Sequence, residues 1–118
     1  MNVSQIEKAV RFRALHDGPG AFVIPNPWDT GSARILAGLG FQALATSSGA
    51  SASVIGRTDG GLTRDEALAH ARLIVDATDL PVSAALEKGF GDAPGRIFDR
   101  AANQSRLGSK PDGLRYNF

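Results

Sequence analysis

The sequence contains no cysteine, which excludes disulfide bonds and thiolate metal sites. It also contains no apolar run that approaches the ~20 residues of a membrane-spanning helix. Residues 1–15 carry charged side chains at intervals and lack the apolar core of a secretory signal. We therefore expect a cytoplasmic protein, although the lack of cysteine is compatible with other compartments too.

A large excess of charge of either sign is also missing. The 13 basic and 12 acidic side chains leave a formal net charge of +1. This balance gives no reason to expect nucleic acid or an anionic membrane as a partner. Hydrophobic residues make up 42% of the 118 residues, which is typical of one globular domain with a modest core.

Capping residues predict where three helices begin. Ser4 and Glu7 form a capping box, in which the hydroxyl accepts an orphan amide and the carboxylate reaches back. Asp29 is a good N-cap for a second helix, and Thr63 with Glu66 forms a second capping box. In the first helix, three apolar residues fall near one face, namely Ile6, Val10 and Leu15.

Short apolar segments between the helices are predicted to be strands. They are Phe22–Pro25, Ala43–Thr46 and Val82–Leu86, and the first is wholly apolar, like a strand buried on both faces. Strands that alternate with helices through short links pair in parallel, with right-handed crossovers. Both a doubly wound sheet and a (β/α)8 barrel satisfy this order, and periodicity alone does not choose between them.

Several patterns have a simpler structural interpretation than a functional one. Residues 38–43 match the letters of a dinucleotide fingerprint, but they close a helix instead of opening one. The Gly- and Ser-rich loop at 47–61 lacks the Gly-Lys-Ser/Thr ending of a nucleotide P-loop. His16 and His70 are isolated histidines, and for His70, inside a predicted surface helix, we expect a solvated or capping role.

Two loops follow predicted strands and are therefore candidate site loops. Active-site loops of a barrel lie at the carboxyl ends of its parallel strands. The loop at 47–61 has this position, and so does the stretch Glu87–Asp92, which places a carboxylate directly after a strand. A flexible connector and an exposed turn are the alternative interpretations of the two segments.

Three ordered motifs resemble the phosphoenolpyruvate mutase/isocitrate lyase superfamily. The first is 22–34, the second is 46–50 followed by 56–60, and the third is 80–92. The resemblance covers roughly residues 4–95. It implies that residues 4–94 form the N-terminal, incomplete part of a (β/α)8 TIM barrel with parallel strands.

The resemblance also implies a chemistry. Members of the superfamily are Mg²⁺-dependent lyases and mutases (isomerases) that act on small 2-oxo or 2-hydroxy acids. They break or rearrange carbon–carbon or carbon–phosphorus bonds through an enolate-like intermediate. An enolate places negative charge on oxygens, which a divalent cation and backbone donors stabilise in a site already organised for it.

By the same resemblance, individual residues acquire expected roles. Ser48 and Gly49 would hold substrate oxygens through hydroxyl and amide groups. Asp59 would lie on the mobile loop that closes over the substrate and take part in catalysis. Glu87 would contribute to the Mg²⁺ centre through water.

The sequence departs from the superfamily pattern at the expected metal centre. An acid that is the principal protein contact to the metal is replaced by Ala85, and alanine offers no oxygen ligand. Lys88 replaces a usual Asn and adds a positive charge beside the cation. We therefore expect Mg²⁺ binding to be weak or lost and this chain to be inactive.

The C-terminal part of the chain also departs from the pattern. A full barrel takes about 250 residues and eight strands, and residues 95–118 resemble nothing in the superfamily. Gly108, Pro111 and Gly113 interrupt any apolar period there, so we assign 95–118 to an irregular tail. A frameshifted or truncated reading frame would produce such a tail.

Three functional hypotheses remain open at this point. The chain is an active small-acid lyase or mutase completed by other chains, a non-catalytic remnant, or a small α/β module that binds an anion through Ser48 and Gly49. An unclosed barrel leaves strand edges and apolar faces uncovered, so we expect self-association.

Overall fold

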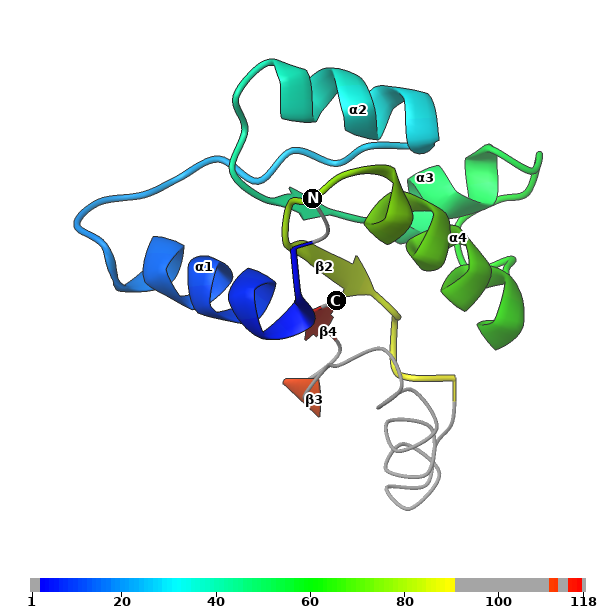
Figure 1. Cartoon of the computed structure of the whole chain (residues 1–118). Helices are drawn as coiled ribbons and strands as arrows, with labels where there is room; N and C mark the ends of the chain where they lie inside the picture. The colour runs from blue at the N-terminus through cyan, green and yellow to red at the C-terminus, as the bar shows by residue number, and fades with distance from the viewer. Residues whose placement is uncertain (1–2, 91–110, 113–114, 118) are drawn as a thin grey trace.

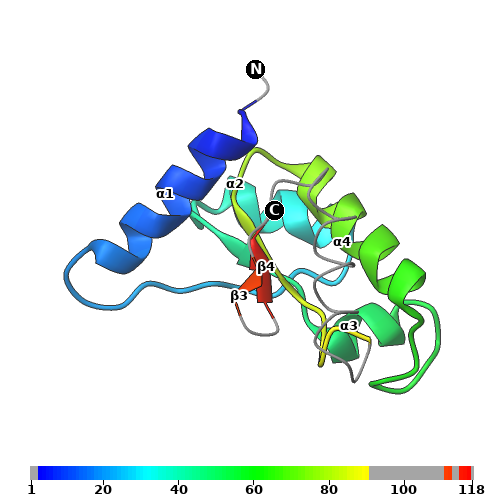
Figure 2. The same ribbon diagram turned by 90° about the horizontal axis from the view of Figure 1, so that it is seen from below.

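Two parallel strands lie at the centre of the computed structural model, which describes residues 3–90, 111–112 and 115–117 (Figure 1). Helices flank them, and α1 and α4 lie on either side of the strands in both views (Figures 1 and 2). In chain order the elements are α1 (Gln5–Asp17), α2 (Thr30–Gly38), β1 (Leu44–Ala45), α3 (Ser48–Ser53), α4 (Arg64–Ala77), β2 (Val82–Ala85), β3 (Pro111–Asp112) and β4 (Arg115–Asn117).

The pairing of β1 with β2 is parallel, as the sequence predicted. Leu44 lies opposite Val82, and Ala45 lies opposite Ser83. The carboxyl ends of both strands therefore meet at one end of the fold, and the chain enters α3 from β1 at that end. This is the end at which the sequence predicts the site loops.

The prediction of a first strand buried on both faces at Phe22–Pro25 is wrong. The segment is not part of the sheet, although the Pro25 carbonyl accepts a hydrogen bond from the Ala45 amide at 3.1 Å. Val23 is 69% exposed, so one side of the segment faces solvent. An apolar run alone does not supply the regular ladder of hydrogen bonds that defines a strand.

Part of the predicted irregular tail is regular. β4 pairs antiparallel with β2, with Ala85 opposite Arg115, and β3 pairs antiparallel with β4. These contacts are backbone pairs of very short strands, which leave little apolar pattern in a sequence. The other predictions for the tail, and Asp92 with it, fall in 91–110, 113–114 and 118, outside the described residues.

The predicted helix starts are confirmed. Ser4 Oγ accepts from the Glu7 amide at 3.2 Å, while Glu7 Oε2 accepts from the Ser4 amide at 2.7 Å. Thr63 and Glu66 repeat this capping box at the start of α4. Gly40 follows α2 with a φ of 95°, a left-handed conformation that glycine adopts at little cost.

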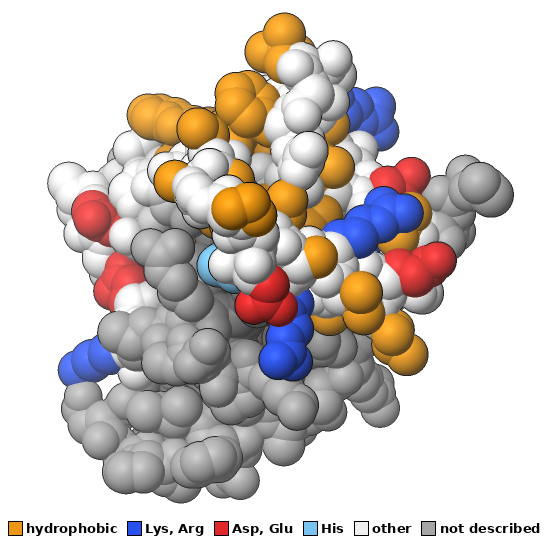
Figure 3. All heavy atoms as spheres, turned by 90° about the vertical axis from the view of Figure 1, so that its left-hand side faces the viewer, with side chains coloured by type: hydrophobic (Ala, Val, Ile, Leu, Met, Phe, Trp, Pro, Cys, Tyr) orange, Lys and Arg blue, Asp and Glu red, His pale blue; other side chains and the backbone are white. Residues whose placement is uncertain are grey.

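The buried face of α1 differs from the one that its apolar residues suggested. Ile6 and Val10 are 78% and 63% exposed, whereas Lys8 and Phe12 are buried. The long Lys8 side chain can cover apolar surface with its methylene groups. Apolar side chains also gather on the upper part of the face shown in Figure 3, at the height of α2 in Figure 1.

The core lies between the parallel strands and the pair α2 and α4, which pack against each other. Small side chains dominate the helical side, and they let the helices approach the strands closely. The core residues are Ala33, Leu44, Ala67, Ala71, Ile74, Val75, Val82, Ala84 and Leu86. Within the described ranges, none of the helices has the length and apolar character needed to cross a membrane.

Candidate functional site

The carboxyl ends of β1 and β2 are joined beyond the last paired residues. The Thr46 amide donates to the Ser83 carbonyl at 2.8 Å, and the Thr46 hydroxyl accepts from the Ala85 amide at 3.0 Å. Thr46 is buried, so these bonds are shielded from water. They fix the starting points of the two site loops relative to each other.

The segment after β1 is partly helical, so the prediction of one continuous loop over 47–61 is wrong. Ser47 is the N-cap of α3, and its hydroxyl accepts from the Ala50 amide at 3.3 Å. Ala50 and Ala52 are buried on the inner side of this helix. A capping Ser followed by small helix-compatible residues was the signal that the sequence offered. Ser48 and Gly49 form the first turn, which we call the Ser48–Gly49 turn.

The structure brings Asp59 to this turn. A Cβ atom built on Gly49 would lie 3.7 Å from Asp59 Cγ and 3.8 Å from its Oδ2. The loop folds back at this point because the Gly61 amide donates to the Thr58 carbonyl at 2.9 Å. Three residues that the superfamily resemblance singled out, Ser48, Gly49 and Asp59, therefore lie together.

Arg57 holds this loop at both of its ends, a role that the sequence interpretation missed. The Arg57 amide donates to the Ala52 carbonyl of α3 at 2.9 Å. Its guanidinium donates to Glu66 Oε1 on α4 at 2.5 Å and to the Gly61 carbonyl at 3.3 Å. The capping box marked Glu66 as an acceptor, but nothing local indicated a second donor from another segment.

Hydrogen bonds stabilise the charged form of Glu66. The backbone N–H of Thr63 and then the Arg57 guanidinium hold the pKa of the Glu66 carboxyl below its ordinary value. The side chain therefore stays ionised at neutral pH and keeps the loop attached to the first turn of α4.

At the end of β2, Ala85 is half-buried and Glu87 is exposed with a φ of 49°. A small cavity joins this strand end to the Ser48–Gly49 turn. It is lined by Ser48, Ser51, Leu62, Ala67, Ala85, Glu87 and Phe90. The structure thus brings Glu87 and Ala85 to the same cavity as Ser48. The sequence predicted this, because the segments at 47–61 and Glu87–Asp92 each follow a predicted parallel strand.

The donor set at this cavity does not fit Mg²⁺. This cation takes hard oxygen ligands in an octahedral arrangement. Glu87 is the one carboxylate in the cavity lining, and the methyl group of Ala85 offers no ligand. Among the described residues, no group of three or more His, Cys, Asp or Glu side chains could hold a metal ion.

The two histidines have different environments. His16 Nδ1 lies 2.8 Å from the Phe12 carbonyl in the last turn of α1. The prediction of a solvated or capping His70 is wrong, because only 9% of this residue is exposed. Its ring bonds with Ser51 on α3 and with the Trp28 carbonyl, two segments far from it in sequence.

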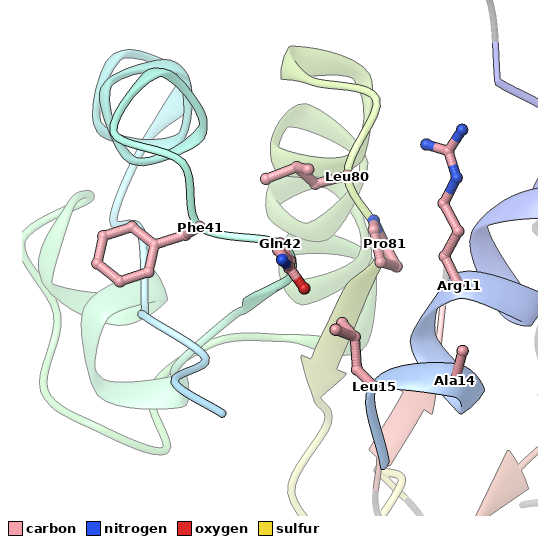
Figure 4. Close-up of a pocket in the computed structure, with 7 residues that line it drawn as sticks. All are labelled: Arg11, Ala14, Leu15, Phe41, Gln42, Leu80 and Pro81. Carbon is pink, nitrogen blue, oxygen red and sulfur yellow. The ribbon is translucent and has the colours of Figure 1, made fainter. Parts of the chain in front are cut away.

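A larger pocket lies elsewhere, near the amino ends of the strands (Figure 4). It has a volume of about 340 Å³ and a mostly apolar lining of Arg11, Ala14, Leu15, Phe41, Gln42, Leu80 and Pro81. Gln42 precedes β1 and Pro81 precedes β2, so this pocket is at the end opposite Ser48. Catalytic groups of a barrel gather at the carboxyl ends of its strands. We therefore place the candidate site at the Ser48 end of the strands and not in this pocket.

Known proteins resemble this chain over most of its length. The family profile of phosphoenolpyruvate phosphomutase matches residues 12–109. The chain is 39% identical over 87 residues to 2,3-dimethylmalate lyase of Eubacterium barkeri, an alignment that covers 72% of this chain and 30% of that protein.

Solved structures agree with this similarity. A candidate lyase/mutase from Burkholderia cenocepacia J2315 superposes with a TM-score of 0.83 and 51% identity, covering 88% of this chain and 38% of that one. Phosphoenolpyruvate phosphomutase from Streptomyces platensis subsp. rosaceus gives a TM-score of 0.73 and 29% identity, covering 85% and 35%. The chain therefore spans roughly a third of the length of these proteins.

Proposed function

Because the chain belongs to the phosphoenolpyruvate mutase/isocitrate lyase superfamily, we propose that it carries the anion-binding part of a lyase or mutase site. The substrate class is small 2-oxo or 2-hydroxy acids, and the reaction type is cleavage or rearrangement of a carbon–carbon or carbon–phosphorus bond through an enolate. The proximity of Ser48, Gly49 and Asp59 at the carboxyl end of β1 supports this proposal most strongly.

Each of these residues has a distinct role in the proposal. The Ser48 hydroxyl and the Gly49 amide bind the carboxylate or enolate oxygens of the substrate. Donors already aimed at developing negative charge lower the cost of forming an enolate. Asp59 covers the bound acid from the loop that Arg57 holds, and it limits the access of water.

The metal centre is where we propose that this chain differs from its relatives. The superfamily resemblance implies Mg²⁺, which would stabilise the enolate oxygens when bound. Glu87 would contact it through water, but the alanine at 85 supplies no direct ligand. We therefore propose that this chain retains the ability to bind the acid, and that its turnover is slow or absent.

A non-catalytic anion-binding module is the second candidate function. The observation that favours it is the combination of an intact Ser48–Gly49 turn with the ligand-poor end of β2. Such a module would bind small dicarboxylates without transforming them. Self-association through exposed apolar side chains such as Ile6 and Val10 would accompany either function.

Oxalate binding and turnover together test these proposals. Oxalate is a planar anion whose oxygens are spaced like those of the enolate of a 2-oxo acid. We expect calorimetry to detect oxalate binding that Ser48→Ala weakens and that the exposed control Ser53→Ala leaves unchanged. Mg²⁺-dependent cleavage of 2-hydroxy acids at a rate typical of enzymes would overturn the proposal of slow turnover. Absence of oxalate binding with and without Mg²⁺ would overturn both candidate functions.

A further inference from the structure

His70 lies at the meeting point of three segments near the candidate site. It belongs to α4, and its Nε2 atom is 2.7 Å from the backbone carbonyl of Trp28. Its Nδ1 atom is 2.9 Å from the hydroxyl of Ser51 on α3. Trp28 directly precedes the N-cap of α2, so one buried ring connects the start of α2 with the middle of α3 and the middle of α4.

The hydrogen positions in this network follow from the partners. A carbonyl oxygen only accepts, so the bond to Trp28 requires the hydrogen on Nε2. In the neutral ring Nδ1 is then an acceptor, and the Ser51 hydroxyl must donate to it. Ser51 Oγ also lies 2.8 Å from the Ser47 carbonyl, but its single hydrogen cannot serve both acceptors at once.

The direction of this bond has a consequence for the turn. The Ser47 carbonyl still accepts from the Ser51 amide at 2.9 Å, the regular helical bond of α3. When the His70 ring is neutral with its hydrogen on Nε2, the Ser51 hydroxyl donates to Nδ1 instead of to the Ser47 carbonyl and links α3 to α4. The two ring nitrogens therefore link α3 to α4 and to Trp28, in addition to the link that Arg57 makes between α3 and α4.

We propose that His70 is a positioning residue, which in its Nε2-protonated form fixes the Ser48–Gly49 turn for anion binding. Gly49 and Ser51 are two residues apart in the six-residue helix α3, so a shift at Ser51 is passed on to the turn. The inference rests on the proposed function only for the role of the turn. His70 does not line the cavity that joins Ser48 to Glu87, so it acts through Ser51 and touches no substrate.

The surroundings of His70 allow the two bonds to be removed separately. The ring borders an open pocket lined by Ser51, Ile55, Leu62, Glu66, Ala69, His70 and Leu73, with a volume of about 230 Å³. Smaller amide side chains can therefore replace the ring. In His70→Asn the amide oxygen lies near the position of Nδ1 and accepts from Ser51. In His70→Gln the amide nitrogen lies near the position of Nε2 and donates to Trp28.

The first measurement is made on the unmodified full chain. Long-range ¹H–¹⁵N correlation spectra identify which ring nitrogen is protonated while the imidazole is neutral. We expect the hydrogen on Nε2 of His70, whereas His16 should carry it on Nδ1, which donates to the Phe12 carbonyl. A His70 ring protonated on Nδ1 would overturn the inference without any variant.

The second measurement compares variants of the network. A hydrogen bond contributes about 0.5–1.5 kcal/mol, so we expect roughly threefold to tenfold faster amide exchange at Gly49 and Ala50 in Ser51→Ala and His70→Gln. In His70→Asn, amide exchange at these residues should stay as slow as in the unmodified chain. The exposed control Ser53→Ala should also leave amide exchange unchanged. A role in stability alone would give equal effects for both His70 variants, and that result would overturn the inference.

Oxalate titration of the same variants separates this inference from the proposed function. We expect the oxalate dissociation constant to rise in parallel with amide exchange in Ser51→Ala and His70→Gln. Unchanged oxalate affinity in these variants would overturn the positioning role. If the unmodified chain does not bind oxalate, the proposed function is wrong, and so is the anion-binding part of the inference. The tautomer of the His70 ring still tests the direction of the hydrogen bonds in that case.

Discussion

The guanidinium of Arg57 donates to the carboxylate of Glu66 across the glycine-rich loop, with 2.5 Å between Nη1 and Oε1. The same oxygen accepts from the Thr63 amide at 3.0 Å. One carboxylate therefore both caps α4 and holds the loop that carries Asp59. This double use makes the loop sensitive to changes at a helix cap.

Arg57→Gln should loosen the Asp59 loop. The substitution removes the ion pair, and an exposed pair contributes modestly, so we expect amide exchange of residues 57–61 to become roughly twofold to fivefold faster. Arg64→Gln is the matched control, because Arg64 forms its ion pair with the adjacent Asp65 in the first turn of α4. Equal acceleration in both variants would contradict the role given to Arg57.

Acidification should destabilise the chain through Glu66. The ordinary pKa of this carboxyl is 4.5, and the Thr63 N–H and Arg57 lower this pKa in the folded state. A depressed folded pKa gives stability that is present above the ordinary value and is lost as pH falls through the folded pKa. Urea unfolding at a series of pH values below 4.5 should therefore show a smaller loss for Glu66→Gln than for the unmodified chain. Parallel pH curves would contradict this assignment.

Gly61→Ala should distort the same loop. An added Cβ would lie 2.8 Å from the Thr58 carbonyl oxygen and 3.2 Å from Arg57 Cβ. Such overpacking costs about 1–3 kcal/mol, measurable by urea unfolding. Gly38→Ala is the control, because nothing lies within 4 Å of its added Cβ and the residue is in a helix. We expect the control to be neutral or slightly stabilising.

Asp59→Asn should tighten oxalate binding. The Asp59 carboxylate is close to Gly49, so its negative charge opposes an anion bound to the Ser48–Gly49 turn. Removing the charge while keeping the size of the side chain should lower the oxalate dissociation constant several-fold at low salt, measured by calorimetry. Asp79→Asn, at the opposite end of β2, should have no effect. Weaker binding in Asp59→Asn would show that Asp59 helps to hold the anion.

Ala85→Asp should strengthen Mg²⁺ binding. The change adds a carboxylate at the cavity that Glu87 lines, and metal affinity should rise at least about tenfold, because even indirect ligands contribute 10–100-fold. Ala85→Asn provides a control of equal size without the charge. Calorimetric titration with Mg²⁺ measures the difference. No gain in a folded Ala85→Asp sample would contradict the placement of the metal site.

Local features of the fold were predictable from the sequence, and contacts between distant segments were not. Ser4, Asp29 and Thr63 marked helix starts correctly because a cap depends on residues three positions away. The parallel order of β1 and β2 also followed from local alternation. The burial of His70 depends on Trp28 and Ser51, far away in sequence, and no local pattern encodes it.

The same distinction between local features and contacts of distant segments applies to the candidate site. The positions of Ser48 and Glu87 after their strands could be predicted, since parallel strands bring such residues to one end. The return of Asp59 to Gly49 depends on Arg57 and on a tight turn, so it required the structure. The prediction of a strand at Phe22–Pro25 was wrong for a related reason. An apolar run indicates burial, but it does not show whether the segment pairs with the sheet, and this one does not.

The antiparallel pairing of β4 with β2 has a consequence for assembly. A parallel barrel extends by adding a parallel strand beside its last strand. In this chain the edge of β2 is already occupied along Ser83 to Ala85. An incoming strand from another copy must therefore displace β4 before it can pair with β2 at this edge, so that addition would be a strand-exchange reaction with its own barrier.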